Sequence, residues 1–338
     1  MDLIPNSEQQ QIIDSSARFL ADHLPVARLH TEDEDAFRVD DQTWQGMADL
    51  GWFALGLEER LSGIGYTLSE EVLLLRELGR QIGPLSVMAT MLAARVAALA
   101  GRDKIVQELL SGDARAGIAN RVGACENPGS TLTGDFQLID GEGARYLIYL
   151  SQTCAMLIDA RALPETELSD CLDTSTSLRR VNLEKVEAAC RIEGEEALSV
   201  FRRGLILTAA MQTGQAMACR DMAVEYSKTR VQFDRPIGFF QAVKHRCSNM
   251  AVRCEAADSL TIYASVADVG LQSDAPLAAI SAKLIAGDAA KINAADNVQI
   301  HGAIGFTAEY DAHLFVKRSH LMDLLFSPPA VTRQLILR

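Results

Sequence analysis

Clusters of lysine and arginine are absent from this 338-residue chain, which carries 32 basic and 45 acidic side chains and a formal net charge of −13. Nucleic-acid binding needs basic side chains that are concentrated on one face, where they neutralise phosphate groups. The charge balance therefore argues against a nucleic-acid partner.

Long uncharged apolar segments are also absent, although 48% of the residues are hydrophobic. A membrane-spanning helix needs about 20 predominantly apolar residues. Residues 1–6 lack the basic start and the apolar run of a secretory signal peptide. We therefore expect a cytoplasmic protein that has no membrane partner.

Metal-binding patterns are the third absence. The seven cysteines form no C-x-x-C pair, and no histidines lie near them at zinc-ligand spacing. We expect reduced thiols and no metal site.

The apolar patterning divides the chain into three regions. Residues 1–113 have helical periodicity, with capping boxes expected at residues 7–10 and 67–70. Residues 114–193 contain short β-leaning runs separated by Gly, Asn, Asp, Ser and Thr, which predicts a small antiparallel β domain. Residues 194–338 return to helical periodicity and predict an antiparallel four-helix bundle, with helices over about residues 197–228, 239–269, 276–301 and 308–325.

Two segments of the third region carry the clearest functional signal. Residues 230–241 read Arg-Val-Gln-Phe-Asp-Arg-Pro-Ile-Gly-Phe-Phe-Gln, and residues 299–310 read Gln-Ile-His-Gly-Ala-Ile-Gly-Phe-Thr-Ala-Glu-Tyr. Arginine offers phosphate groups a fixed fork of donors, and glutamine both donates and accepts hydrogen bonds. Together, the two segments resemble the C-terminal flavin-contact signatures of the acyl-CoA dehydrogenases.

The resemblance covers essentially the whole chain, and it is strongest over residues 211–317 and weakest in the β region. It implies a mainly α fold with a small β domain. The expected order is an N-terminal helical domain, a middle β domain and a C-terminal four-helix bundle.

The resemblance also implies FAD that is shared across a subunit interface. Arg230 would meet the pyrophosphate of a neighbour's FAD, Phe233 the adenosine side, and Gln241 a ribose or adenine edge. The predicted cofactor-binding residues are Arg230, Gln232, Phe233, Gln241, Gln299, Gly302 and Ala303. Ala303 replaces the family's second turn glycine, so its β-carbon would crowd the dinucleotide if the backbone there required a positive φ.

A proton acceptor is missing from the position where the resemblance places it. Removal of the α-proton of an acyl thioester needs a carboxylate held opposite the flavin, but the corresponding residue is Phe326. An alternative family position corresponds to Gly204 and Leu205, and Glu195 and Glu196 lie several turns away. We therefore predict no catalytic residue in this chain.

The β region lacks two further family motifs, Thr-Glu-Pro-x-x-Gly-Ser-Asp and Trp-x-Thr-Asn, which surround the isoalloxazine ring and the thioester. Residues 120–128 and 145–149 occupy their places. His301 and His313 have no nucleophile or carboxylate motif around them, so both are predicted to be structural. By resemblance, Glu309 helps to place a helix, and His245 packs between helices.

These observations lead to one hypothesis and leave two alternatives open. The chain would be the non-catalytic subunit of a heteromeric FAD-dependent enzyme that desaturates an acyl-CoA, such as a bulky or steroid side-chain thioester. Its partner, in a two-plus-two heterotetramer, would hold most of the substrate and the base, and an electron-transfer flavoprotein or similar acceptor would take the electrons. The alternatives are a flavin-free structural or regulatory protein with the same fold and a homomeric dehydrogenase with a relocated base.

Overall fold

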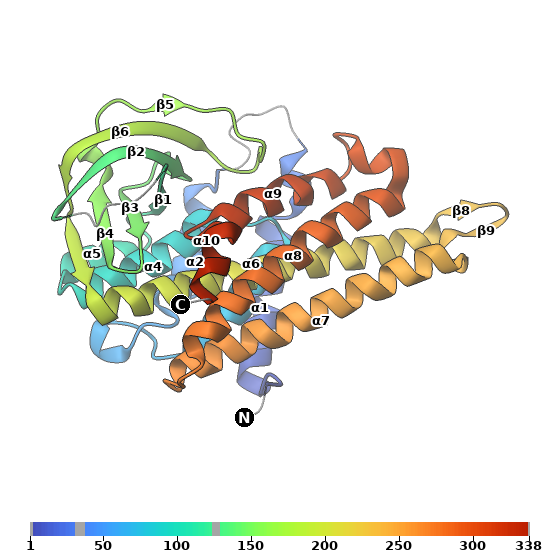
Figure 1. Cartoon of the computed structure of the whole chain (residues 1–338), viewed down its shortest axis with the longest axis horizontal. Coiled ribbons are helices and arrows are strands. Elements are labelled where there is room, and N and C mark those ends of the chain that lie inside the picture. The colour runs from blue at the N-terminus through green and yellow to red at the C-terminus, as the bar shows by residue number, and fades with distance from the viewer. Residues whose placement is uncertain (1–2, 31–37, 124–128, 337–338) are drawn as a thin grey trace. The chain divides into compact units, whose positions relative to one another are not determined.

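The computed structural model in Figure 1 describes residues 3–30, 38–123 and 129–336. The chain has an N-terminal helical region, a middle β-sheet region and a C-terminal helical region, and most of its ordered elements are helices. This result confirms the predicted fold class. The domain boundaries at residues 113 and 193 stay a prediction.

The chain forms two compact units. The sheet unit comprises Asp35–Glu71 and Pro84–Gly204, and the bundle unit comprises Met1–Glu34, Val72–Gly83 and Leu205–Arg338. Helices α3 (Leu68–Arg80) and α6 (Gly194–Thr229) contribute residues to both units.

Among the described residues of the sheet unit, seven strands form one sheet in the order β5-β6-β2-β1-β3-β4-β7. The β1–β3 pair is parallel and the other pairs are antiparallel, so the prediction of a wholly antiparallel sheet was wrong in this detail. The strands are β1 (Ala116–Arg121), β2 (Thr131–Ile139), β3 (Tyr146–Leu150), β4 (Cys154–Asp159), β5 (Glu167–Leu168), β6 (Leu178–Glu187) and β7 (Cys190–Glu193).

The sheet encloses its own apolar core. Leu132, Phe136, Leu147 and Tyr149 lie in this core, and the rings of Phe136 and Tyr149 meet edge to face with centroids 5.9 Å apart. The helices of this unit are α2 (Asp41–Asp49), α4 (Leu85–Leu99) and α5 (Asp103–Leu110), with 3₁₀ turns η2 (Trp52–Ala54), η3 (Glu59–Leu61) and η4 (Ala160–Ala162). Because most side chains of α4 are apolar around its whole circumference, the helix is almost fully buried.

Long helices dominate the bundle unit, with the C-terminal half of α6 among them (Figure 1). The others are α1 (Ser7–His23), α7 (Gln241–Val269), α8 (Ala275–His301), α9 (Ala312–Leu324) and α10 (Pro329–Ile336), with 3₁₀ turns η1 (Val26–Leu29), η5 (Ile237–Phe239) and η6 (Gly302–Phe306). The four predicted bundle helices are confirmed, whereas α10 was not anticipated. None of the described helices is long and apolar enough to cross a membrane.

Two predicted helix starts can be compared with the observed caps. The box at residues 67–70 is confirmed, since the Glu70 carboxylate accepts hydrogen bonds from the backbone N–H and hydroxyl of Thr67 at 2.8 and 2.6 Å. The box at residues 7–10 was placed one residue too late, because Asn6 is the N-cap of α1 and pairs with Gln9. Asparagine and serine are about equally favourable N-caps, so residue type alone did not show whether Asn6 or Ser7 caps the helix.

Candidate functional site

A β-hairpin follows α6 and carries three of the predicted site residues. The backbone N–H of Arg230 donates to Tyr226 O at 2.8 Å, and Ile237 N donates to Arg230 O at 2.9 Å. Between them, β8 (Val231–Gln232) pairs with β9 (Arg235–Pro236), and the hairpin extends beyond the helices of its unit (Figure 1). The exposed Arg230 guanidinium forms no hydrogen bond or ion pair with the described residues, so its donors are available to a ligand.

The hairpin turn consists of Phe233 and Asp234. Their φ angles are 55° and 61°, as a two-residue type I′ turn requires. Such angles are unfavourable for a bulky side chain, and the ring of Phe233 is 82% exposed. Because conformational strain of this kind collects at functional sites, the exposed Phe233 ring is a candidate ligand contact.

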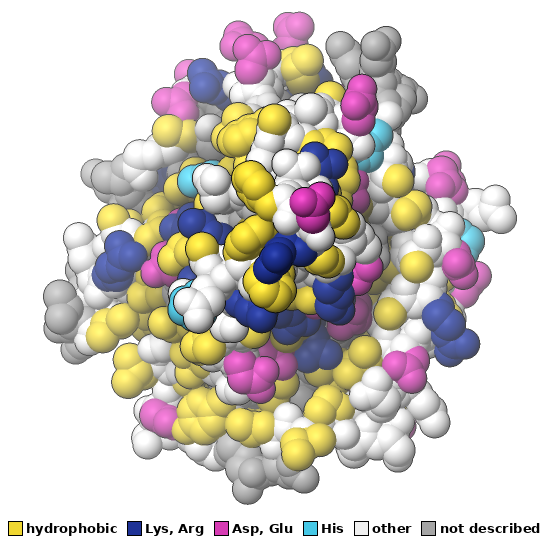
Figure 2. Space-filling model, turned by 90° about the vertical axis from the view of Figure 1, so that its right-hand side faces the viewer, with side chains coloured by type: hydrophobic (Ala, Val, Ile, Leu, Met, Phe, Trp, Pro, Cys, Tyr) yellow, Lys and Arg dark blue, Asp and Glu magenta, His cyan; other side chains and the backbone are white. Residues whose placement is uncertain are grey.

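Aromatic rings and cations alternate beside this turn. The Arg235 guanidinium lies 4.3 Å from the centre of the Phe239 ring, and the Lys244 ammonium lies 5.8 Å from it. Gln241 begins α7 with an exposed side chain. Figure 2 views this end of the molecule and shows apolar and basic side chains interleaved. The surface therefore offers both stacking and anion-binding groups.

The second predicted segment forms the turn after α8. Gln299 is exposed on the last helical turn, and Gly302 has φ 65° and ψ −140°. Ala303 follows in η6, and it is not among the described residues with positive φ. The crowding anticipated for Ala303 therefore does not arise from a positive φ, because Gly302 takes the unusual conformation.

Replacing Gly302 with alanine should cost about 1–3 kcal/mol of unfolding free energy, because its φ and ψ values are nearly restricted to glycine. A β-carbon there would meet no atom within 4 Å, so the cost would come from the backbone alone. Denaturant unfolding of the purified chain measures it. Ala303→Gly is the matched control and should give no comparable loss; equal losses in both variants would contradict this account.

An aromatic stack joins the two segments. The ring centroids of Tyr226 on α6 and His301 on α8 lie 4.1 Å apart and are nearly parallel, at 28°. His301 also lies 4.7 Å from the Tyr310 ring. Since Arg230 follows Tyr226 by one helical turn and Gly302 follows His301 directly, both segments lie at one end of the bundle (Figure 1). Sequence reasoning missed this stack.

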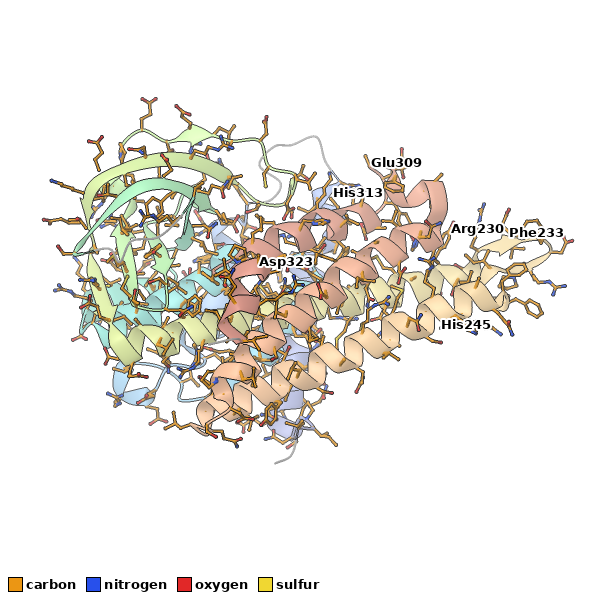
Figure 3. The ribbon with its side chains drawn as sticks, in the orientation of Figure 1. Arg230, Phe233, His245, Glu309, His313 and Asp323 are labelled. Atoms are coloured by element: carbon orange, nitrogen blue, oxygen red, sulfur yellow. The ribbon has the colours of Figure 1, made fainter. Side chains whose placement is uncertain are left out.

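The remaining polar candidates around this end do not form a second site. Glu309 is exposed in the segment between η6 and α9, and His313 lies half-buried on α9 (Figure 3). Burial lowers the pKa of His313, which favours its neutral form. His245 is exposed on α7 (Figure 3), so the prediction that it packs between helices was wrong.

The chain is similar in sequence to proteins of one known family. Two models of one family match the chain, "Acyl-CoA dehydrogenase, N-terminal domain" over residues 6–116 and "Acyl-CoA dehydrogenase, C-terminal domain" over residues 195–338. Acyl-CoA dehydrogenase IpdE2 of Mycobacterium tuberculosis is 32% identical, and the alignment covers 98% of each chain. The chain belongs to the acyl-CoA dehydrogenase family.

Two solved structures share the fold of this acyl-CoA dehydrogenase-family chain. The ChsE4–ChsE5 complex from Mycobacterium tuberculosis gives a TM-score of 0.86 at 22% identity, covering 100% of this chain and 98% of that chain. A variant of the Tcur3481–Tcur3483 steroid ACAD gives 0.85 at 24% identity and covers 98% of both chains. At these identities the likeness shows the fold alone. Proteins of this family bind FAD and are oxidoreductases that act on CH–CH bonds.

The expected base position of the family is occupied by an apolar residue. Phe326 is half-buried, with φ 59°, directly after the C-cap residue of α9. The carboxylate of Asp323, three residues earlier, accepts a hydrogen bond from Lys291 Nζ at 2.5 Å. The sequence analysis did not single out Asp323, which is labelled in Figure 3. Because its carboxylate forms an ion pair with Lys291, we assign it a structural role.

The end of α9 is fixed by a buried lysine. Lys283 is 2% exposed, and its Nζ donates to Met322 O at 2.9 Å and Asp323 O at 3.2 Å. Burial lowers the pKa of Lys283 to about 8. The ammonium bonds the last carbonyls of α9, where the helix dipole favours a cation. The segment that contains Phe326 therefore follows a rigid helix end.

The alternative base position carries no carboxylate either. Gly204 and Leu205 are buried, and Glu195 and Glu196 are exposed in the first turn of α6. Glu71 of the sheet unit is buried, but its Oε2 accepts from Arg203 Nε at 2.7 Å. This buried carboxylate is therefore committed to an arginine.

In the β region, Tyr146 and Tyr149 lie at the position of one missing family motif, and both make contacts within the protein. The Tyr146 hydroxyl donates to Glu108 Oε2 at 2.7 Å, and burial together with this bond raises the pKa of Tyr146 to about 12. Tyr149 lies in the sheet core. The other replaced motif lies at residues 120–128, of which 124–128 fall outside the described residues.

The exposed groups at the bundle end fit part of an FAD molecule. The uncommitted Arg230 fork suits a pyrophosphate, the exposed rings suit an adenine, and the exposed Gln241 and Gln299 side chains suit polar edges. In Gln232, the side-chain Nε2 donates to Val231 O at 3.0 Å and its Oε1 stays available as an acceptor. The assignments of all seven predicted site residues stay a prediction.

Proposed function

We propose that this chain is the non-catalytic subunit of a heteromeric FAD-dependent acyl-CoA dehydrogenase. The observation that carries the proposal is an asymmetry within one polypeptide. Donors and rings suited to a dinucleotide lie exposed on the hairpin and on the turn after α8, whereas Phe326 occupies the base position.

The residues of this chain bind the dinucleotide half of the cofactor. When bound, FAD supplies the flavin that accepts a hydride from the acyl group. Arg230 binds the pyrophosphate through its guanidinium fork, and Phe233 covers the adenosine side. Gln241 and Gln299 hold polar edges of the nucleotide, and the Gly302 turn allows backbone groups to approach closely.

An apolar stripe on α8 supports assembly with another subunit. Leu277, Ile285 and Ile292 are 50%, 42% and 46% exposed. Their spacings of eight and seven residues, each about two helical turns, place them on one face of α8. Seven residues further along the same face is Gln299, so the stripe runs into the proposed cofactor contacts.

The proposed partner supplies what this chain lacks. It holds the isoalloxazine ring, most of the acyl-CoA and the carboxylate that removes the α-proton, in a two-plus-two heterotetramer. The names of similar structures, a two-protein complex and a steroid ACAD, support a heteromer that acts on a bulky or steroid side-chain thioester. Electrons leave to an electron-transfer flavoprotein or a similar acceptor.

Co-expression with a full-length acyl-CoA dehydrogenase from the same organism tests the proposal. Yellow colour and acyl-CoA oxidation with a dye acceptor should arise in the mixture and not in this chain alone. Colour and activity in this chain alone would instead favour a homomeric enzyme with a relocated base. Absence of flavin from every preparation that contains the chain would favour a flavin-free structural protein.

A further inference from the structure

The Tyr226–His301–Tyr310 stack connects the end of α6 to the end of α8 and to the segment before α9. Tyr226 lies in the last turns of α6, His301 ends α8, and Tyr310 precedes α9. Besides the two close ring contacts already described, the Tyr226 and Tyr310 rings meet edge to face at 6.4 Å. His301 is 4% exposed, so the centre of the stack is closed to solvent.

We infer that Tyr226, His301 and Tyr310 are positioning residues that lock the Arg230 hairpin and the Gln299–Ala303 turn into one frame. The frame itself follows from contacts within the chain, and its role in holding FAD rests on the proposed function. None of the three side chains needs to touch the cofactor. Each acts through the backbone of a neighbouring contact segment.

The hydrogen bonds of His301 require one tautomer. Its Nδ1 lies 2.8 Å from Asn297 O, which can only accept, so Nδ1 carries a proton. Its Nε2 lies 2.9 Å from the Tyr310 hydroxyl, which donates to it when the imidazole is neutral. A second proton on Nε2 would make it a donor to the Tyr310 oxygen and would place a charge in a buried site, which is unfavourable.

The charged and titratable groups around the frame come from four segments. Tyr226 on α6 and Tyr310 before α9 contact His301, Asp311 lies beside Tyr310, and His313 lies on α9. The Asp311 carboxylate is paired with His30, which follows η1 and whose Nδ1 lies 2.7 Å from Ala308 O. Burial opposes the charge of His30, but its hydrogen bonds to Asp311 and Ala308 outweigh burial and raise its pKa.

The frame should therefore loosen in acid. Burial lowers the pKa of His301 below its ordinary value of 6.5. The unfolded state then binds more protons than the folded state in the interval between the two values. The stabilisation by neutral His301 is full above pH 6.5 and is lost as the pH falls through the lowered pKa.

Two variants separate ring packing from hydrogen bonding. Tyr310→Phe keeps the ring but removes the donor to Nε2. His301→Phe keeps an aromatic ring against Tyr226 but removes both hydrogen bonds and the titration. Tyr263→Phe is the matched control, because its hydroxyl bonds Asp274 at the other end of α7.

Hydrogen exchange of the purified chain measures the frame without flavin or partner. In Tyr310→Phe, exchange in residues 226–240 and in residues 298–310 should rise together by about 5-fold, since a buried hydrogen bond contributes about 1 kcal/mol. His301→Phe should give a larger rise, and Tyr263→Phe none in these ranges. A rise confined to residues 298–310 would show that the hairpin is not held by the stack and would overturn the inference.

The pH profile distinguishes the frame from a simple packing role. After correction for intrinsic exchange, the wild-type chain should keep its protection above pH 6.5 and lose it in both ranges as the pH falls below that value. His301→Phe should show no such step, and an unchanged step in this variant would also overturn the inference. Arg230→Ala should leave the exchange pattern unchanged, because the Arg230 side chain is not part of the stack. If this variant bound FAD as tightly as the wild type, the proposed function would be refuted, whereas the inference about the frame would stand.

Discussion

Replacing Arg230 with alanine should weaken FAD binding to the assembled complex by about 10- to 100-fold. A hydrogen bond that involves charged groups contributes about 1.5–3 kcal/mol, and the Arg230 guanidinium has no competing partner among the described residues. Titration of the flavin-depleted complex with FAD, followed by flavin fluorescence, measures the change.

Two further variants make this result specific. Arg230→Lys keeps the charge but lacks the planar fork, so its affinity for FAD should fall between those of the wild type and Arg230→Ala. Arg60→Ala removes an exposed arginine that pairs with Glu58 in the sheet unit and should leave the affinity unchanged. Wild-type affinity in Arg230→Ala would refute the pyrophosphate contact.

Replacing Ile292 with aspartate should prevent assembly with the catalytic subunit. An unpaired charge buried in an apolar interface costs several kcal/mol, on the order of 3–5, which corresponds to a weakening of more than about 100-fold. The side chain is 46% exposed in the isolated chain, so the variant should fold with a nearly unchanged unfolding free energy. Size-exclusion chromatography with light scattering would show separate subunits.

A control at a similarly exposed apolar residue tests whether the α8 stripe is the interface. Leu168 is 71% exposed on β5 in the sheet unit, and Leu168→Asp should assemble normally. Assembly of Ile292→Asp at wild-type affinity would refute the stripe as the docking face. Failure of both variants to assemble would point to a general effect of added charge.

The sequence predicted the fold class and the bundle helices because apolar periodicity and caps are local signals. Glu70 capping at Thr67 follows from four adjacent residues. The parallel β1–β3 pair could not be predicted in this way, because strand pairing depends on contacts between residues that are distant in sequence. Helix α10 is short and begins at Pro329, directly after Pro328, and periodicity is weak over such a length.

The residues of the candidate site stay a prediction, and the contacts that support them could not be predicted from the sequence. Arg230 and Gln299 lie in recognisable segments, whereas the Tyr226–His301 contact joins α6 to α8 and has no signature in either segment. The left-handed turn at Phe233 was also unexpected, because aromatic residues rarely have positive φ. His245 was misplaced because resemblance gives residue type and spacing, not which side of α7 faces solvent.

The number of FAD molecules per chain shows whether this chain completes a partner's flavin site. The complex should be purified with its partner, its flavin counted by absorbance after denaturation, and each chain counted by amino-acid analysis. We expect one FAD for each pair of unlike chains, because this chain completes a partner's dinucleotide site and has no base at position 326. Two FAD molecules per pair, or a full complement in this chain alone, would contradict it.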